Sequence, residues 1–327
     1  MSNHHDTGYK ELFSHPEFVQ QLIEGFAPPE IAQLMDFSTL ENHSGHYITP
    51  LFEERIEDLV WSVRAHWQGL SQQVYLYLLL EFQSGVDSRM PIRLLHYVAC
   101  FYDHLLKTKA ASVGEGLPPV FPVVLYNGAT PWSAETDIYG LLQPEPPAFL
   151  RPYQPRLRYY VIDEGRLSVA DLAARQTPLS AVFSLENAAT GEALQQAVER
   201  AVAVMQADPH KERIDRVVTR WFKRHLQRIG TPVDLSGLNS LIEDRSMLAE
   251  NIQNWIRNER QEGHQEGRQE GESLALQRVL SRQIQLKFGA LPDWAEQRLA
   301  QATLQQLEDW SAAILFADSI EALLGGQ

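Results

Sequence analysis

The chain has 327 residues, of which 44% are hydrophobic and 21% charged, and its formal net charge at pH 7 is −14. This composition is typical of a globular protein that can bury a substantial core, and it excludes a disordered chain. The acidic balance argues against a protein that coats nucleic acid through bulk positive charge, although it leaves room for a local basic surface.

The chain contains a single cysteine, which excludes an internal disulfide and a zinc site built on cysteines. Its first residues lack the basic and apolar regions of a signal peptide, and no apolar run approaches the roughly 18 residues of a membrane span. We therefore expect a soluble, cytoplasmic protein without a membrane partner.

The first half of the chain alternates predicted helices and strands. Residues 14–26 are amphipathic and have a proline near the expected first turn, which indicates a helix. Extended segments follow at 37–41 and 51–64, and a polar turn is expected near 67–72. The apolar runs at 74–83 and 120–126 predict strands buried on both faces, and residues 90–107 have a helical period. This order predicts an α/β or α+β core with a mixed sheet flanked by helices.

The second half is predicted to be mostly helical. Residues 144–158 hold five prolines and three arginines, which indicates a rigid, exposed connection, and residues 159–163 can add an edge strand. From residue 167 onward the pattern is almost entirely helical. We therefore divide the chain into an α/β domain over residues 1–165, a helical region over 166–258 and a tail over 259–327.

A repeat with a period of four places Gly263, Gly267 and Gly271 roughly on one side of a helix. Each glycine costs about 1 kcal/mol relative to alanine inside a helix. The segment is therefore either a flexible linker or a helix whose glycine stripe lets a second helix approach closely. The glutamate, glutamine and arginine between the glycines favour the helix, and we expect the tail to drive self-association.

A predicted helix within residues 208–230 carries seven Lys or Arg against three acids. Five of these basic residues recur at a spacing of three and four: Arg213, Arg216, Arg220, Lys223 and Arg224. One interpretation is a solvated helix face, and the other is a surface that contacts DNA phosphates.

Two acidic residues accompany the strands of the predicted core. Glu81 follows the apolar part of the 74–83 run, and Asp58 lies in the preceding strand-like segment, about a hairpin away. Gln83 lies on the same side of the strand as Glu81 because side chains alternate along a strand. Oxygen ligands on adjacent strands suit a hard cation such as Mg²⁺. The competing interpretation is that both acids are solvated strand ends.

Several further stretches accompany these acids and, as a set, resemble one family. They are His5-Asp6 with Tyr9-Lys10, residues 58–63, residues 77–84 with Glu81-Phe82-Gln83, residues 93–97, and residues 122–128 followed by Pro131-Trp132. The set resembles the PD-(D/E)XK nuclease superfamily and, more narrowly, the Rpn family of recombination-promoting nucleases, often labelled transposases. The resemblance is densest over residues 4–133 and extends to the glycine repeat and the helical tail.

The resemblance implies a PD-(D/E)XK restriction-endonuclease-like mixed sheet over residues 1–165, followed by a helical C-terminal region. It also implies a metal-dependent DNA endonuclease linked to DNA recombination. Asp58 and Glu81 would hold Mg²⁺, with Mn²⁺ or Ca²⁺ as alternatives, and the main-chain carbonyl of Phe82 would complete the ligands. Gln83 stands where the superfamily has lysine, as it does in the Rpn-like group. Glutamine can orient a water molecule but cannot act as a base near neutral pH.

Other residues are candidates for supporting roles. Lys10 and Arg93 could supply the positive charge of the missing lysine, and His5 and Asp6 could add a metal or water contact. Glu41 is a candidate third acid. For Lys10 the alternative is an ordinary helix-surface charge, and for Glu41 it is an exposed strand end.

Two classes of function stay open. In the first, the chain is an endonuclease that acts on DNA, as a homo-oligomer such as a dimer formed through the tail. In the second, it is a non-catalytic DNA- or protein-binding module with a nuclease-like core, which the acidic net charge and the missing lysine favour. True transposition lacks support because the sequence shows no spread acidic triad. Acyl transfer and NTP hydrolysis also lack support, because neither a nucleophile elbow nor a P-loop is present.

Overall fold

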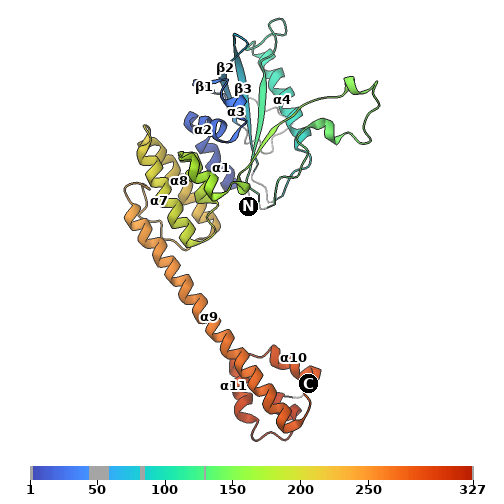
Figure 1. The fold of residues 1–327 in the computed structure, drawn as a ribbon, viewed down its shortest axis with the longest axis vertical. Helices are drawn as coiled ribbons and strands as arrows, with labels where there is room; N and C mark the ends of the chain where they lie inside the picture. The colour runs from blue at the N-terminus through green and yellow to red at the C-terminus, as the bar shows by residue number, and fades with distance from the viewer. Residues whose placement is uncertain (1–2, 44–58, 82–84, 129, 326–327) are drawn as a thin grey trace. The chain divides into compact units, whose positions relative to one another are not determined.

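A five-stranded sheet and its flanking helices form the first part of the chain (Figure 1). The computed structural model describes residues 3–43, 59–81, 85–128 and 130–325. The strands are β1 (Met35–Asn42), β2 (Leu59–Trp67), β3 (Leu70–Glu81), β4 (Val120–Tyr126) and β5 (Tyr160–Asp163). The helices around them are α1 (Asn3–Leu12), α2 (Pro16–Phe26), α3 (Pro29–Ala32) and α4 (Met90–Lys107).

Helices make up most of the chain after β5. They are α5 (Val169–Arg175), α6 (Pro178–Glu186), α7 (Gly191–Ala207), α8 (Lys211–Ile229), α9 (Arg245–Phe288), α10 (Asp293–Ala300), α11 (Leu304–Ala313) and α12 (Ile320–Leu324). The chain divides into two compact units, Met1–Gln253 and Asn254–Gln327. The finer division at residues 165 and 258 stays a prediction.

The strands lie in the sheet in the order in which they occur in the chain. The first three are antiparallel, and β4 and β5 then run parallel to β3. The helix α4 lies in the connection from β3 to β4, because a parallel pair needs a long crossover. The mixed sheet flanked by helices, expected from the sequence, is thus confirmed, and β5 is the predicted edge strand.

The turn between β2 and β3 is tighter than the sequence suggests. Trp67 pairs with Leu70, so that only Gln68 and Gly69 form the loop, with φ angles of 52° and 78°. Two positive φ angles match the right-handed twist of the flanking strands. The turn expected near residues 67–72 is therefore present, but it is confined to residues 68 and 69. The polar residues 71–73 pair with β2 although their side chains are exposed, and their composition hides a strand.

Neighbouring residues of β2 show how the two faces of the sheet are covered. Val60 belongs to an apolar cluster with Leu94 and Phe101 of α4. The next residue, Trp61, donates a hydrogen bond from its indole N–H to the carbonyl of Phe13, just after α1 (3.1 Å). Because side chains alternate along a strand, α4 and α1 lie on opposite faces of the sheet.

Helix α1, the helix expected around Lys10, joins the sheet to the later helices. It packs against β3 and, more extensively, against α8. The ring of Tyr9 meets Trp221 edge-on at 5.8 Å between ring centres and stacks on Phe13 at 5.9 Å. Both Tyr9 and Phe13 are fully buried, so α1 forms part of a core shared by the sheet and the helices that follow it.

The glycine repeat lies inside α9, which confirms the helix and excludes the linker. A Cβ atom added at Gly263, Gly267 or Gly271 would meet nothing within 4 Å among the described residues. No second helix of the described chain uses the close approach that the stripe permits. The end of α9 contributes Leu280 and Ile284 to a separate apolar cluster of the second unit.

The β2–β3 turn gives a direct test of the fold. We expect Gly69→Ala to lower the free energy of unfolding by about 1 kcal/mol, because a Cβ atom disfavours the left-handed conformation. Urea unfolding followed by tryptophan fluorescence measures this change. The matched control is Gly114→Ala, since Gly114 lies in open space without a positive φ angle. Equal effects of the two substitutions would contradict the assigned turn.

Candidate functional site

The parallel strands β3, β4 and β5 end in a single row. The backbone of Glu81 pairs with Tyr126, and Tyr126 in turn pairs with Asp163. The carboxyl ends of these strands therefore meet at one edge of the sheet, which we call the carboxyl edge. In α/β folds this edge is where ligands bind, because the loops leaving it converge there.

The central residues of the predicted metal site fall outside what the structure describes. Asp58, Phe82 and Gln83 are not among the described residues, and the same holds for the side chain of Glu81. The described strand ends beside them are adjacent: β2 begins at Leu59, which pairs with Leu78, three residues before the end of β3. The motif thus flanks neighbouring strand ends at the carboxyl edge. Among the described residues no group of three or more His, Cys, Asp or Glu side chains could hold a metal ion.

The supporting candidates are spread over different elements. Lys10 is exposed on α1, whose residues His5 and Asp6 have side chains outside the described part. Arg93 lies on α4, on the opposite face of the sheet, and its Nη1 contacts Asp87 Oδ2 at 2.9 Å. The structure does not bring Lys10 and Arg93 together.

Asp87 is held by several hydrogen bonds within the protein, whereas Glu41 is exposed. Burial opposes the ionisation of Asp87, but hydrogen bonds from the backbone of Arg89 and from Arg93 hold its pKa below the ordinary value. Glu41 is an exposed residue near the end of β1, with a carboxylate oxygen 4.0 Å from the imidazole of His43. Its position agrees with the strand-end interpretation.

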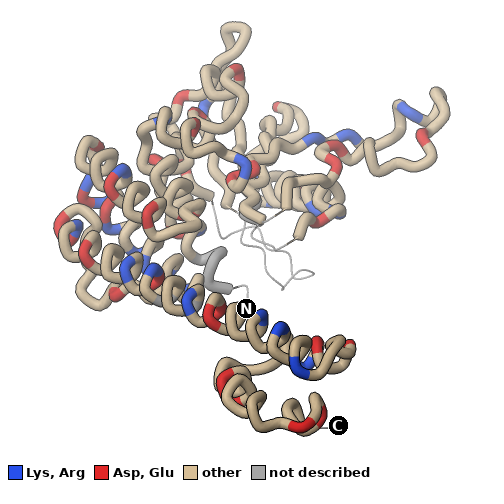
Figure 2. The backbone as a smooth tube through the Cα atoms, turned by 60° about the horizontal axis from the view of Figure 1, so that its bottom comes forward, with Lys and Arg blue, Asp and Glu red and all other residues tan. Residues whose placement is uncertain are grey.

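Figure 2 marks where Lys and Arg lie along the backbone. Most of those on the predicted basic face of α8 have partners within the protein. Arg213 forms an ion pair with Glu17 of α2, and Lys223 donates to the carbonyl of Leu238 at 2.8 Å. Arg220 and Arg224 both contact Glu11 of α1, at 2.7 and 2.6 Å. Arg216 is exposed and has no such contact with the described residues. These contacts hold α8 against the N-terminal helices, and a DNA-binding role for this face stays a prediction.

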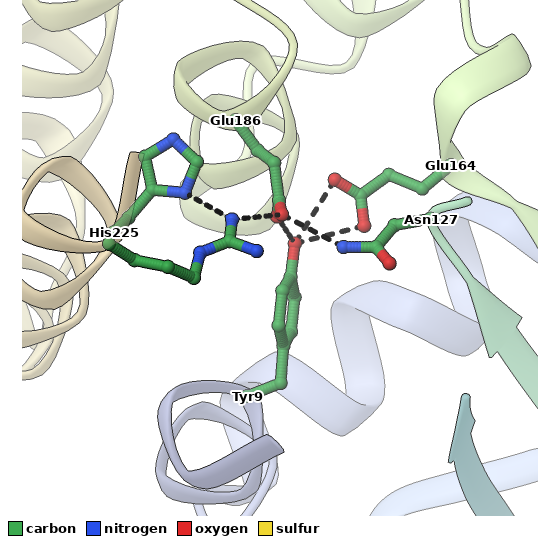
Figure 3. Close-up of polar contacts among 6 residues, drawn as sticks. Tyr9, Asn127, Glu164, Glu186 and His225 are labelled. Carbon is green, nitrogen blue, oxygen red and sulfur yellow. Dashed lines mark hydrogen bonds and ion pairs between the residues drawn. The ribbon is translucent and has the colours of Figure 1, made fainter. Parts of the chain in front are cut away.

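A buried polar cluster joins the carboxyl edge to the helices (Figure 3). Its centre is the hydroxyl of Tyr9, which lies 3.0 and 2.9 Å from the two carboxyl oxygens of Glu164 and is also hydrogen-bonded to Glu186. Glu164 directly follows β5, and Glu186 is the last residue of α6. Asn127, directly after β4, donates its amide N–H to Glu186 Oε1 at 2.8 Å.

The charge of this cluster is only partly compensated. Arg228 Nη2 lies 3.5 Å from Glu186 Oε1 and 3.1 Å from Nδ1 of His225. Glu164 is completely buried and faces Glu186 rather than a cation. Burial first, and then the neighbouring charge of Glu186, raises the pKa of Glu164 well above its ordinary value. The protonated form of Glu164 is therefore favoured over the ionised form, compared with a free glutamate.

A single chain of hydrogen bonds follows from this proton. A protonated Glu164 can donate to the Tyr9 oxygen, and the Tyr9 hydroxyl can then donate to the Glu186 carboxylate. The pKa of Tyr9 is raised by burial and by the two carboxyl groups, so that its hydroxyl keeps its proton. Each group has a partner, and the cluster fixes helix α1 and the ends of β4 and β5 relative to one another.

Sequence reasoning missed Glu164 and Glu186, although it noted Tyr9. One signal was available: Glu186 is the only charged residue of α6. A lone acid at the end of an otherwise apolar helix costs free energy unless it is partnered. The partners of Glu186 are residues 9, 127, 164 and 228, and no sequence pattern predicts that these distant residues come into contact.

The raised pKa of Glu164 predicts how stability depends on pH. Above about pH 4.5, the ordinary glutamate value, the unfolded chain releases a proton that the folded chain keeps. Stability therefore falls as the pH rises toward the raised pKa, by up to about 1.4 kcal/mol per pH unit. The variant Glu164→Gln, which keeps an N–H donor for Tyr9, should lack this decline.

Urea unfolding of the wild type and of Glu164→Gln between about pH 5 and pH 8 measures the difference. Glu30→Gln is the control, because Glu30 is exposed on α3 and should leave the pH dependence unchanged. Parallel pH profiles for the wild type and Glu164→Gln would show that Glu164 is ionised in the folded protein.

Comparison with known proteins places the chain in a family. The family described as "Putative transposase, YhgA-like" matches residues 3–215. The recombination-promoting nuclease RpnC of Escherichia coli K12 is 32% identical over 130 residues, which are 39% of this chain and 40% of that protein. The recombination-promoting nuclease RpnD of Escherichia coli O157:H7 is 29% identical over 136 residues, 40% of this chain and 49% of that protein.

Not every relative carries the name of an active nuclease. The inactive recombination-promoting nuclease-like protein RpnE of Escherichia coli K12 is 24% identical over 129 residues, 39% of this chain and 40% of that protein. The matches thus span less than half the length of these three relatives. No solved structure matches the chain. With its mixed sheet, its flanking helices and a family match over residues 3–215, the chain belongs to the YhgA-like transposase family, which is related to the recombination-promoting nucleases.

Proposed function

We propose that this protein is a metal-dependent DNA endonuclease that hydrolyses phosphodiester bonds and promotes recombination. One observation carries the proposal: the Asp58 and Glu81-Phe82-Gln83 motif flanks the ends of the adjacent strands β2 and β3, at the carboxyl edge. The names of the relatives RpnC and RpnD support a nuclease.

Among the described residues, none of the helices combines the length and apolar character needed to cross a membrane.

The proposed ligands fit a hard cation. The carboxylates of Asp58 and Glu81 and the main-chain carbonyl of Phe82 are all oxygen donors, as Mg²⁺, Mn²⁺ and Ca²⁺ prefer. A bound Mg²⁺ would offset negative charge at the phosphate and lower the pKa of a water molecule. Gln83 would orient that water through its amide, and the DNA phosphate would bind at the carboxyl edge.

The structure favours one of the two candidates for the missing positive charge. Arg93 is engaged by Asp87, whereas Lys10 is exposed on α1 without an ion pair to any described residue. The buried cluster around Tyr9 holds α1 beside the carboxyl edge. We therefore assign to Lys10 a contact with the phosphate, and to Arg93 a structural role on α4.

The second candidate function is a non-catalytic DNA- or protein-binding module. One observation favours it: a relative of similar identity, RpnE, is named inactive. The chain carries Asp58, Glu81 and Gln83, the residues that the resemblance to the Rpn family implies for the site. Activity is therefore the proposal that comes first.

Cleavage of supercoiled plasmid tests the enzyme. We expect nicking or linearisation with Mg²⁺ or Mn²⁺ and none with EDTA, because the phosphate needs a positive charge beside it. Asp58→Ala and Glu81→Ala should each lower the rate at least about 100-fold, which corresponds to about 2.7 kcal/mol of lost transition-state stabilisation. Glu30→Ala, at an exposed glutamate outside the site, is the matched control.

Two outcomes would reject the assignment. Wild-type rates in Asp58→Ala or Glu81→Ala would place the active site elsewhere. A folded wild type that binds plasmid but cleaves it with none of the metals would favour the binding module.

We also propose that the C-terminal unit mediates self-association. Its side chains Leu286, Leu315 and Phe316 are 80%, 77% and 85% exposed, which is costly for large apolar groups. Light scattering should give an oligomer for the full-length wild type and a smaller mass for Leu315→Asp/Phe316→Asp. Equal masses would exclude this surface. Val113→Asp, at an exposed apolar residue of the first unit, is the control.

A further inference from the structure

A projecting arm connects β4 with β5 (Figure 1). The two ends of this connection, residues 136–138 and 157–159, are hydrogen-bonded to each other and form what we call the neck. Ile138 N–H donates to the carbonyl of Leu157 (3.1 Å), and Tyr159 N–H donates to the carbonyl of Thr136 (3.0 Å). We call residues 139–156 beyond this neck the arm. It extends away from the sheet and, unlike most of the first unit, has no buried apolar residue of its own.

The arm is nevertheless well defined by local contacts. Five prolines between residues 144 and 155 restrict its backbone. Arg151 contacts a carboxylate oxygen of Glu145 at 2.9 Å and donates from Nε to the carbonyl of Pro146 at 3.0 Å. A short 3₁₀ turn (Arg151–Tyr153) then presents the end of the arm. A preformed element loses little conformational entropy when it binds a partner.

The end of the arm combines exposed aromatic rings with positive charge. Phe149 and Tyr153 are 72% and 82% exposed, which is unusual for such large side chains. The arm carries two arginines against one glutamate, a net charge of +1 in a chain whose net charge is −14 (Figure 2). Aromatic rings beside arginines are the combination that contacts bases and phosphates of nucleic acid.

The position of the neck brings the arm near the proposed site. The neck joins β5 at Tyr160, three residues before Asp163, which lies in the row with Tyr126 and the backbone of Glu81. Three residues span about 10 Å along a strand. The 18 residues of the arm fold back on themselves, so the arm can reach at most about 30 Å from its neck. Duplex DNA that is bound at the carboxyl edge and runs along β5 would therefore pass beside the base of the arm.

We propose that the arm grips duplex DNA beside the bond to be cut, with Phe149 and Tyr153 in a groove, against the sugars or wedged at a base step, and Arg151 and Arg156 on phosphates. This inference rests on the proposed function, because it places the DNA at the carboxyl edge. The pairing of Arg151 with Glu145 does not oppose it, since both side chains are about half exposed and such pairs exchange readily for a phosphate. The guanidinium of Arg156 lies 5.3 Å from the ring centre of Tyr139. Such a contact with the ring leaves its N–H groups able to donate to a phosphate as well.

Fluorescence anisotropy with a labelled DNA duplex tests the arm, using the full chain in EDTA so that cleavage does not interfere. Phe149→Ser/Tyr153→Ser should weaken binding at least about fivefold, as expected when a stacking contact is lost. The matched control is Val113→Ser/Leu117→Ser, at exposed apolar residues of the loop before β4. It should bind as the wild type does.

A salt series separates the charge of the arm from its rings. Arg151→Gln/Arg156→Gln should lower the slope of log affinity against log salt by about 1.8, the effect of two lost phosphate contacts. Arg278→Gln/Arg282→Gln, at exposed arginines of α9, makes the same change in net charge and should leave the slope unaltered. The mass of every variant is measured by light scattering.

The outcomes distinguish this inference from the proposed function. If the wild type binds and cleaves DNA but the arm variants bind as tightly as their controls, the arm proposal is wrong and the nuclease stands. If the arm variants lower the mass while each protomer binds DNA as before, the arm contacts a second copy of the chain and the proposal is also overturned. A wild type that neither binds nor cleaves DNA would reject both.

Discussion

A buried contact of two carboxyl groups with one tyrosine joins distant elements of the first unit of this protein. Glu164 comes from the end of β5 and Glu186 from the end of α6, and the hydroxyl of Tyr9 of α1 is hydrogen-bonded to both. Two ionised carboxylates next to each other inside a protein would repel each other strongly. The raised pKa of Glu164 favours its uncharged form, which weakens that repulsion, and Arg228 of α8 forms an ion pair with Glu186. Four elements far apart in the sequence thus depend on one another for the stability of their polar groups.

This dependence explains the place of helix α1 in the protein. An isolated helix of ten residues is marginal in water, so α1 is stable because its Tyr9 and Leu12 side chains, and that of Phe13 just after it, are buried. The ion pairs of Glu11 with Arg220 and Arg224 lie at the surface, where such pairs contribute little each. They orient the helix, while the apolar core and the buried cluster supply the larger part of its stability. Lys10, which we assign to the proposed site, thus lies on a helix whose position is fixed by the buried contacts of Tyr9.

Sequence patterns predicted the parts of the fold that local physics determines. The apolar runs of β3 and β4 and the period of α4 depend only on nearby residues, and the sequence placed β4 and α4 at their observed bounds and β3 without its first four residues. The N-terminal part of β3 was lost because Ser71, Gln72 and Gln73 are polar and exposed. The bounds of helix α1 were not predicted because seven of its ten residues are polar. The cluster of Glu164 and Glu186 could not be predicted, because it arises only when distant elements meet. The roles of Asp58, Glu81 and Gln83 came from resemblance to a family, and they remain to be measured.

The glycine repeat in α9 allows the length of this helix to change during evolution. Each four-residue unit adds about 6 Å and a net rotation of about 40° to a helix. Because nothing in the described chain packs on Gly263, Gly267 or Gly271, gaining or losing one unit would break no side-chain contact and would keep the helical hydrogen bonds. The described residues therefore place no packing constraint on the number of units at these glycines. The length of α9 is thus free to drift in steps of one unit, while the packed elements on either side of it are not.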